Sequence, residues 1–224
     1  MKKNNKERFM VYTEEEKYYY ENNFYLTCDT SRIGKMLAHN ELYKKIINLS
    51  GAVVELGVFK GASLCRFAML RNLYEINSSR KIIGFDTFAG FPDTEYDDDK
   101  YFPKLHNDIS ASITKEKLFE SLDKRNLNNA IELIEGDITK TVPEYVKNNP
   151  ALKISLLNLD TDVYEPAVTA LEYLYPRVCN GGVVIVDNYG QVPGETKVID
   201  EYFKDKNIII LKFPYSSTPS YFIK

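Results

Sequence analysis

Histidine and cysteine are scarce in this sequence, with two of the former and three of the latter among 224 residues. His39 and His106 are too few and too far apart to suggest a histidine-based zinc site. Cys28, Cys65 and Cys179 are odd in number and form no C-x-x-C pair. We therefore interpret them as reduced thiols of a cytoplasmic protein.

Long apolar runs and an excess of positive charge are also missing. No stretch approaches the ~20 apolar residues that a membrane span needs. The charged first residues lead into a Tyr- and Glu-rich stretch rather than the apolar core of a signal peptide. The formal net charge of −3 argues against a nucleic-acid-binding protein, which normally presents a basic face. We expect neither a membrane nor a nucleic acid as a partner.

Short runs rich in Val and Ile alternate with helical patterns from residue 52 onward. The predicted strands are 52–56, 81–85, 131–135, 154–159, 183–187, 207–212 and about 220–223. Helices are expected between them at 63–76, 115–122, 142–147, 166–175 and 195–203. Unalternated apolar strands separated by helices predict a doubly wound α/β fold with a mostly parallel sheet. In such a sheet the ligand lies beyond the carboxyl ends of the strands.

The first fifty residues are polar, tyrosine-rich and helical in pattern. They contain too few apolar residues to fold alone, so we interpret residues 1–50 as an N-terminal helical cap on a domain formed by 51–224. The irregular acidic stretch from Pro92 to Ser110 is long for a loop, and such loops are usually lids or disordered. This stretch and the cap are the segments available to close over a site.

The first predicted strand ends in Glu55-Leu-Gly57-Val-Phe-Lys-Gly61-Ala-Ser63. Two glycines four apart at the start of a helix let the backbone approach a ligand with its N–H groups free. The spacing is not the G-x-G-x-x-G pattern of dinucleotide-binding folds. Glu55 would repel a pyrophosphate but suits an ammonium or sulfonium. The pattern favours S-adenosylmethionine, and the alternative is a tight turn without a ligand.

Carboxylates also follow the second and third predicted strands. Asp86, followed by Thr87 and Phe88, is placed to accept both hydroxyls of a ribose, although a lone aspartate there is usually a turn or capping residue. Asp137 is placed to accept the exocyclic amine of an adenine, with Ile138 against the ring. Capping of the next helix is an equally good interpretation of Asp137.

The fourth predicted strand is followed by Asp160-Thr-Asp162, and the fifth by Asp187-Asn188. Adjacent strands bring these side chains together, and two carboxylates with an amide oxygen are ligands that Mg²⁺ accepts. We expect Asp160, Asp187 and Asn188 to hold the metal. Asp160 also serves as the catalytic base, with Asp162 as the alternate base. Simple strand and helix ends are the alternative interpretation for each residue.

Taken together, these motifs resemble the macrocin O-methyltransferase family, and within it the nucleotide-diphosphate deoxysugar 3-O-methyltransferases. The resemblance covers roughly residue 30 to the C-terminus. It rests on residues 55–63, 83–92, 135–137, 159–166 and 181–187, with 193–196 and 213–222 similar to the deoxysugar branch. It implies the class I methyltransferase fold, S-adenosylmethionine as donor, a sugar hydroxyl as acceptor, and a homo-oligomer whose N-terminal segments help to close the sites.

The pair Asp187-Asn188 departs from this pattern, because macrolide-sugar members of the family have two consecutive aspartates there. An Asp-Asn pair resembles the catechol O-methyltransferases, which use Mg²⁺. We therefore expect an S-adenosylmethionine-dependent O-methyltransferase acting on a nucleotide-activated deoxysugar, with Mg²⁺ as a second cofactor. The alternative acceptor is a catechol-like or glycosylated natural product.

Three other functions fit the sequence less well. A dehydrogenase would use Tyr-x-x-x-Lys, which occurs only at Tyr96–Lys100 in the acidic loop and at Tyr202–Lys206, far from the glycine turn. A nucleic-acid amino-methyltransferase needs a Pro-Pro-Tyr-like run after the fourth strand, where this chain has Asp160-Thr-Asp162. A non-catalytic module that binds S-adenosylmethionine need not keep Asp160 and Asp187, and both are present.

Overall fold

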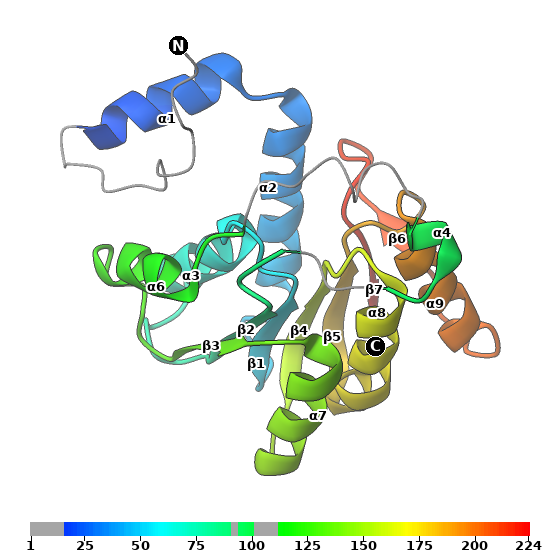
Figure 1. Ribbon diagram of the computed structural model, residues 1–224. Helices are drawn as coiled ribbons and strands as arrows, with labels where there is room; N and C mark the ends of the chain where they lie inside the picture. Colours follow the sequence, from blue (N-terminus) through cyan, green and yellow to red (C-terminus); the bar gives the residue numbers. More distant parts are fainter. Residues whose placement is uncertain (1–15, 91–93, 101–111) are drawn as a thin grey trace.

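A seven-stranded sheet runs through the molecule in the order β3-β2-β1-β4-β5-β7-β6 (Figure 1). The computed structural model describes residues 16–90, 94–100 and 112–224. The parallel strands are β1 (Ala52–Leu56), β2 (Ile82–Asp86), β3 (Ile131–Glu135), β4 (Ile154–Leu159) and β5 (Val178–Val186), and the antiparallel ones are β6 (Leu211–Lys212) and β7 (Ser220–Ile223). The predicted doubly wound, mostly parallel seven-stranded sheet is confirmed.

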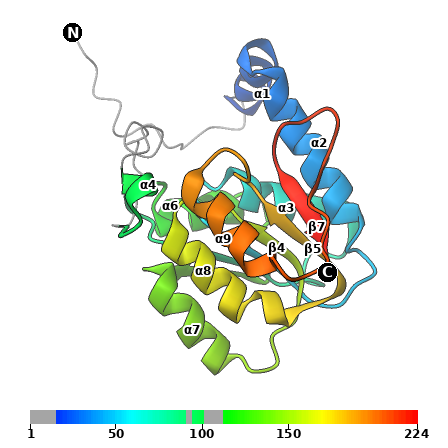
Figure 2. The same cartoon turned by 90° about the vertical axis from the view of Figure 1, so that its right-hand side faces the viewer.

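Helices cover both faces of this sheet (Figures 1 and 2). One face packs against α7 (Ile138–Asn148), α8 (Tyr164–Tyr173) and α9 (Pro193–Phe203). The other packs against α2 (Thr30–Lys44), α3 (Ala62–Tyr74) and α6 (Lys115–Asp123). Every residue of β1, β2 and β4 is buried, because each of these central strands has helices on both sides. Two-sided burial explains why these strands are apolar without alternation.

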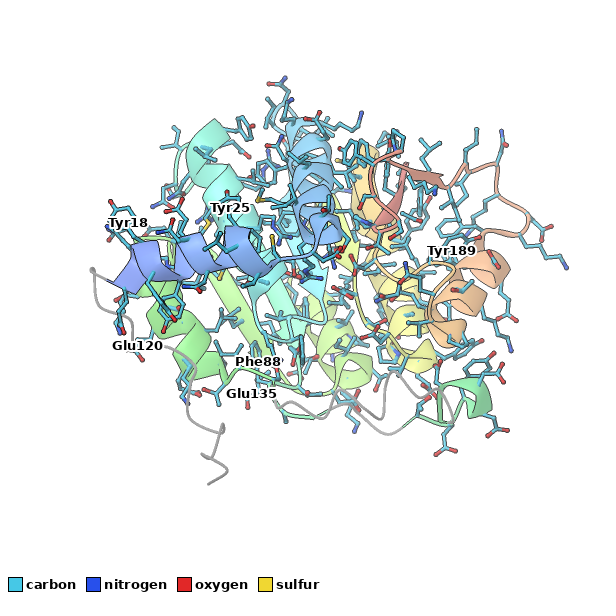
Figure 3. All side chains as sticks on the ribbon, turned by 90° about the horizontal axis from the view of Figure 1, so that it is seen from above. Tyr18, Tyr25, Phe88, Glu120, Glu135 and Tyr189 are labelled. Atoms are coloured by element: carbon cyan, nitrogen blue, oxygen red, sulfur yellow. The ribbon has the colours of Figure 1, made fainter. Side chains whose placement is uncertain are left out.

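The two N-terminal helices differ in how they relate to the domain. The first, α1 (Glu16–Thr27), buries none of its residues, and Figure 3 shows Tyr18 and Tyr25 along it. The second, α2, is part of the core, since Leu42 packs with the apolar residues of α3 and β1. A Cβ on Gly34 of α2 would lie 2.9 Å from the carbonyl oxygen of Tyr215, so glycine lets α2 approach the loop before β7.

Three predicted elements differ from the structure by more than two residues at one end. The strand predicted at 183–187 is longer, since β5 begins at Val178, five residues before its predicted start. The strand predicted at 207–212 is reduced to Leu211–Lys212 at the edge of the sheet, while Ile208 and Ile210 pack on the core outside any strand. The helix predicted at 142–147 begins at Ile138, because Asp137 caps it.

Only part of the acidic Pro92–Ser110 segment is described. It contains the short helix α4 (Asp97–Lys100), which packs beside α9. Residues 91–93 and 101–111, and with them the predicted lid, lie outside the described residues, as do residues 1–15 of the predicted cap. No helix in the described ranges is long and apolar enough to cross a membrane.

Candidate active site

The two glycines after β1 are needed by the protein's own backbone. Gly57 has a φ of +83°, and a Cβ there would lie 1.8 Å from the carbonyl oxygen of Asp160, so the turn passes directly against the end of β4. Gly61 has a φ of +77°, and its added Cβ would lie 2.5 Å from Cδ1 of Leu118. A residue with a side chain would therefore be disfavoured at both positions, because the positive φ would strain its backbone and its Cβ would collide with protein atoms.

Glu55 lies completely buried at the end of β1. Its Oε1 accepts hydrogen bonds from the Ser63 hydroxyl and, at 3.2 Å, from Nδ2 of Asn158 on β4. Its Oε2 is buried and has no partner among the described residues. Burial raises the pKa of Glu55 to about 7. Ser63 thus contacts Glu55 itself, and one carboxylate oxygen stays available for a positively charged group.

Asp86 joins the glycine turn to the loop after β2. Its Oδ2 accepts from the Phe59 N–H at 2.8 Å and its Oδ1 from the Phe88 N–H at 2.6 Å. Both of these phenylalanines have a φ of +50°, so the carboxylate holds two unusual turns together. Thr87 closes the second turn, since its hydroxyl donates to the carbonyl oxygen of Gly90 at 3.0 Å. The ribose role of Asp86 stays a prediction.

Asp137 adopts the capping role that the sequence allowed. Its Oδ1 accepts from the Thr139 N–H at 2.9 Å at the start of α7, and its Oδ2 lies 3.0 Å from Nζ of Lys140. The hydrogen bond from the Thr139 side chain is the main cause that lowers the pKa of Asp137. Ile138 is buried in the core between α7 and the sheet. Contacts of Asp137 and Ile138 with an adenine stay predictions.

The polar residues predicted after β4 and β5 do meet, and we call Asp160, Asp162, Asp187 and Asn188 the acid cluster. Nδ2 of Asn188 donates to Oδ1 of Asp160 at 3.0 Å and to Oδ1 of Asp162 at 2.8 Å. Asp162 has a φ of +63°, which turns the chain sharply between β4 and α8. The carboxylates thus approach one another because parallel strands end at one edge of the sheet.

Lys35 of α2 belongs to this site, although no sequence motif predicted it. Its Nζ lies 2.6 Å from Oδ2 of Asp187 and 3.9 Å from Oδ2 of Asp160. Burial alone would lower the pKa of Lys35, but the charges of Asp160 and Asp187 raise it above its ordinary value. The α2 helix therefore contributes an ammonium group to the reactive edge.

Glu195 of α9 is a second unpredicted member of the site. It is fully buried and accepts the N–H of Asn188 at 3.0 Å and that of Asp162 at 3.3 Å. Burial raises the pKa of Glu195 to about 8. Its position beside the acid cluster depends on how α9 packs, which no local sequence pattern reveals.

The predicted metal ligands fit a cation only in part. Asp187 Oδ1 is buried with no partner among the described residues, which leaves one oxygen for a cation. Burial, and next the charge of Asp187, raises the pKa of Asp160 well above its ordinary range. However, the ammonium of Lys35 already contacts Asp187, and Asn188 presents its amide nitrogen to Asp160. Among the described residues, no three His, Cys, Asp or Glu side chains are grouped so that they could hold a metal ion.

Comparison with known proteins identifies the family to which this chain is similar. The family model described as macrocin O-methyltransferase (TylF) matches residues 32–212. The chain is 29% identical over 161 residues to demethyldecarbamoylnovobiocin O-methyltransferase of Streptomyces niveus, covering 69% of this chain and 59% of that protein. It is 26% identical over 167 residues to mycinamicin III 3''-O-methyltransferase of Micromonospora griseorubida, covering 68% and 60%. The chain thus spans about three fifths of the length of these two relatives.

Solved structures show the same similarity over more of the chain. The calicheamicin methyltransferase CalS11 is 30% identical with a TM-score of 0.82, over 96% of this chain and 86% of that one. An apo structure of CalS11, there called a TDP-rhamnose 3'-O-methyltransferase, is 27% identical with a TM-score of 0.71, over 96% and 87%. The O-methyltransferase NovP, 23% identical with a TM-score of 0.75 over 84% and 78%, supports the fold alone. The predicted class I methyltransferase fold is confirmed.

Proposed function

This chain belongs to the macrocin O-methyltransferase family, and we propose that it transfers the methyl group of S-adenosylmethionine to a hydroxyl of a nucleotide-activated deoxysugar. One observation carries the proposal: the glycine turn and the acid cluster meet at a single edge of the sheet, where Gly57 lies against the backbone of Asp160. A donor held over β1 and β2 is therefore next to an acceptor held over β4 and β5.

The donor side consists of the residues after β1, β2 and β3. The Oε2 atom of Glu55 suits the ammonium of the donor, because a buried carboxylate oxygen without a hydrogen-bond partner gains from a donor group. Asp86 accepts two N–H bonds, and each of its oxygens retains a lone pair for a ribose hydroxyl. Gly57, Gly61, Ser63, Thr87 and Phe88 shape the turns around these two carboxylates, and Asp137 with Ile138 completes the adenine end.

The acceptor side consists of the acid cluster. Methyl transfer is an in-line displacement, so the protein must align the hydroxyl with the methyl group and take up the hydroxyl proton. We assign proton uptake to Asp160, whose raised pKa makes it a stronger base than an exposed carboxylate. Asp162 is the alternate base, and Asn188 bridges the two carboxylates by donating to both. Lys35 balances the charge of Asp187.

We retain Mg²⁺ as part of the proposal, with Asp160 and Asp187 as the residues that would hold it. A cation bound there would make the acceptor hydroxyl more acidic. Asn188 would join as a ligand only after turning its side-chain oxygen toward the cation, since it now presents the amide nitrogen.

The acceptor class follows from the relatives. CalS11 is called a TDP-rhamnose 3'-O-methyltransferase, which favours a sugar that still carries its nucleotide. Two relatives carry the names of demethyldecarbamoylnovobiocin and mycinamicin III, so a glycosylated natural product is the second candidate acceptor.

We also propose that the chain forms a homo-oligomer in the cytoplasm. The α1 helix buries no residue within the chain and exposes aromatic side chains such as Tyr18, Tyr19 and Tyr25, which a second copy can cover. All three cysteines are free thiols, in keeping with a reducing compartment. Light scattering after gel filtration measures the mass in solution, and a monomer would exclude the oligomer.

The experiment that tests the function is a panel of acceptors incubated with S-adenosylmethionine and analysed by mass spectrometry. The panel contains TDP-rhamnose, a glycosylated natural product and a catechol. We expect TDP-rhamnose to gain the mass of one methylene unit. Methylation of the catechol alone would refute a sugar acceptor, and methylation of the glycosylated product alone would move the proposal to the second candidate.

A further inference from the structure

Asp99 is the buried member of an acidic run that the proposed reaction does not use. Asp97, Asp98 and Asp99 form the first turn of α4, and the first two are exposed while Asp99 is only 1% exposed. A carboxylate is seldom buried without a specific set of partners. The partners of Asp99 therefore indicate what it does.

Both oxygens of Asp99 accept hydrogen bonds from helix N-termini. Its Oδ1 accepts the Gly194 N–H of α9 at 2.8 Å, and its Oδ2 accepts the Tyr164 N–H of α8 at 2.9 Å. The residues that precede these helices, Val163 and Val192, provide no side-chain cap. Asp99 thus caps two helices at once from a distant segment, and its charge is favourable near the positive ends of both helix dipoles.

The lack of a side chain at Gly194 leaves room for the Asp99 carboxylate. A Cβ at Gly194 would lie 2.0 Å from Oδ2 of Asp99, so any larger residue would displace the carboxylate. The position has no positive φ, so the close approach of Asp99 is what opposes a side chain. Substitution of Gly194 therefore disturbs the same contact from the opposite side.

Asp99 and Glu195 make similar contacts, since each links the segment after β4 to the segment after β5. Asp99 bridges Tyr164 to Gly194, while Glu195, the next residue, bridges Asp162 to Asn188. Two buried carboxylates thus fasten the segment after β4 to the segment after β5. These two segments carry the acid cluster.

We propose that Asp99 is a positioning residue, which fixes the spacing between the two halves of the acid cluster by holding the N-termini of α8 and α9 together. Within the described residues its carboxylate accepts hydrogen bonds from two backbone N–H groups, and it acts on the reaction through Asp162, Asn188 and Glu195. Its catalytic consequence rests on the function proposed above, whereas its effect on the two segments does not.

Hydrogen exchange followed by mass spectrometry tests the structural part without any acceptor. In Asp99→Asn the side chain loses its charge and turns a donor toward one of the two N–H groups, so we expect faster exchange over residues 161–165 and 187–196. Gly194→Ala should produce the same pattern. The control Asp97→Asn removes the same charge from an exposed neighbour, and its exchange should equal that of the wild type. Unchanged exchange over both segments in Asp99→Asn and Gly194→Ala would overturn the proposal.

Kinetics with S-adenosylmethionine and TDP-rhamnose test the catalytic part. We expect kcat to fall at least about tenfold in Asp99→Asn and in Gly194→Ala, because small displacements of reacting groups are costly. Donor affinity measured by calorimetry should be unchanged, and the double variant should show no further loss, since both changes break one contact. A wild-type kcat, or a parallel fall of donor affinity and Tm, would overturn the positioning role. A wild type that methylates no sugar would refute the proposed function, and the exchange data would still decide on Asp99.

Discussion

The ammonium nitrogen of Lys35 lies 2.6 Å from Oδ2 of Asp187 and so joins two residues that are 152 positions apart in the chain. This ion pair links α2 to the end of β5 and places a fixed positive charge beside the acid cluster. Since both side chains are largely buried, the pair depends little on salt and much on its geometry.

Lys35→Met should lower both stability and activity. The change leaves the Asp187 carboxylate buried without its counter-charge, and we expect the free energy of unfolding to fall by about 2 kcal/mol or more. The matched control is Lys44→Met on the same helix, where the pair with Glu41 is exposed and should contribute under ~1 kcal/mol. Urea denaturation measures the free energy of unfolding of both variants and of the wild type. Equal losses in the two would contradict a special role for Lys35.

Glu55 should make stability depend on pH. Its pKa is raised by burial from 4.5 to about 7, so the folded protein binds a proton there more tightly than the unfolded chain does. The stability of the wild type should therefore fall, relative to Glu55→Gln, as the pH rises from about 4.5 to about 7, by up to about 3 kcal/mol. Denaturation curves of both proteins across this range measure the difference. A difference in stability between the two proteins that does not change with pH would contradict the raised pKa of Glu55.

Asp86→Ala should weaken donor binding. The change removes the acceptor for the Phe59 and Phe88 N–H groups and the proposed partner of the ribose hydroxyls. We expect a loss of about 1–3 kcal/mol in the affinity for S-adenosylhomocysteine, measured by calorimetry. Asp123→Ala, an exposed change on α6, is the control. Wild-type affinity in Asp86→Ala would exclude Asp86 from the donor site.

Chelation tests whether the activity requires a divalent cation. If Asp160 and Asp187 hold Mg²⁺, exhaustive treatment with EDTA should reduce the rate strongly and added Mg²⁺ should restore it. Donor affinity should change little, because Glu55 and Asp86 lie apart from these ligands at the ends of β1 and β2. Full activity after chelation would eliminate the metal and leave Asp160 as a base supported by Lys35.

The strand-end residues could be predicted because of how parallel sheets are built. Asp160 and Asp187 follow adjacent apolar strands, and that alone brings them to one edge. Lys35, Asp99 and Glu195 could not be found in this way, because each comes from a helix whose rotation and packing are set by the whole core. The predicted strand at 207–212 was wrong in length for a similar reason, since Ile208 and Ile210 pack on the core without pairing with β7.

The central claim is that the acid cluster carries out methyl transfer to a sugar hydroxyl, with Asp160 taking the proton. Asp160→Asn tests it most directly, since the neutral isostere keeps an acceptor for Nδ2 of Asn188 while it removes the base and its buried charge. We measure methylated TDP-rhamnose by mass spectrometry, together with Tm and donor affinity. The account predicts a rate lowered about 10²- to 10⁴-fold, an unchanged or higher Tm and unchanged donor binding. A rate close to that of the wild type would contradict it.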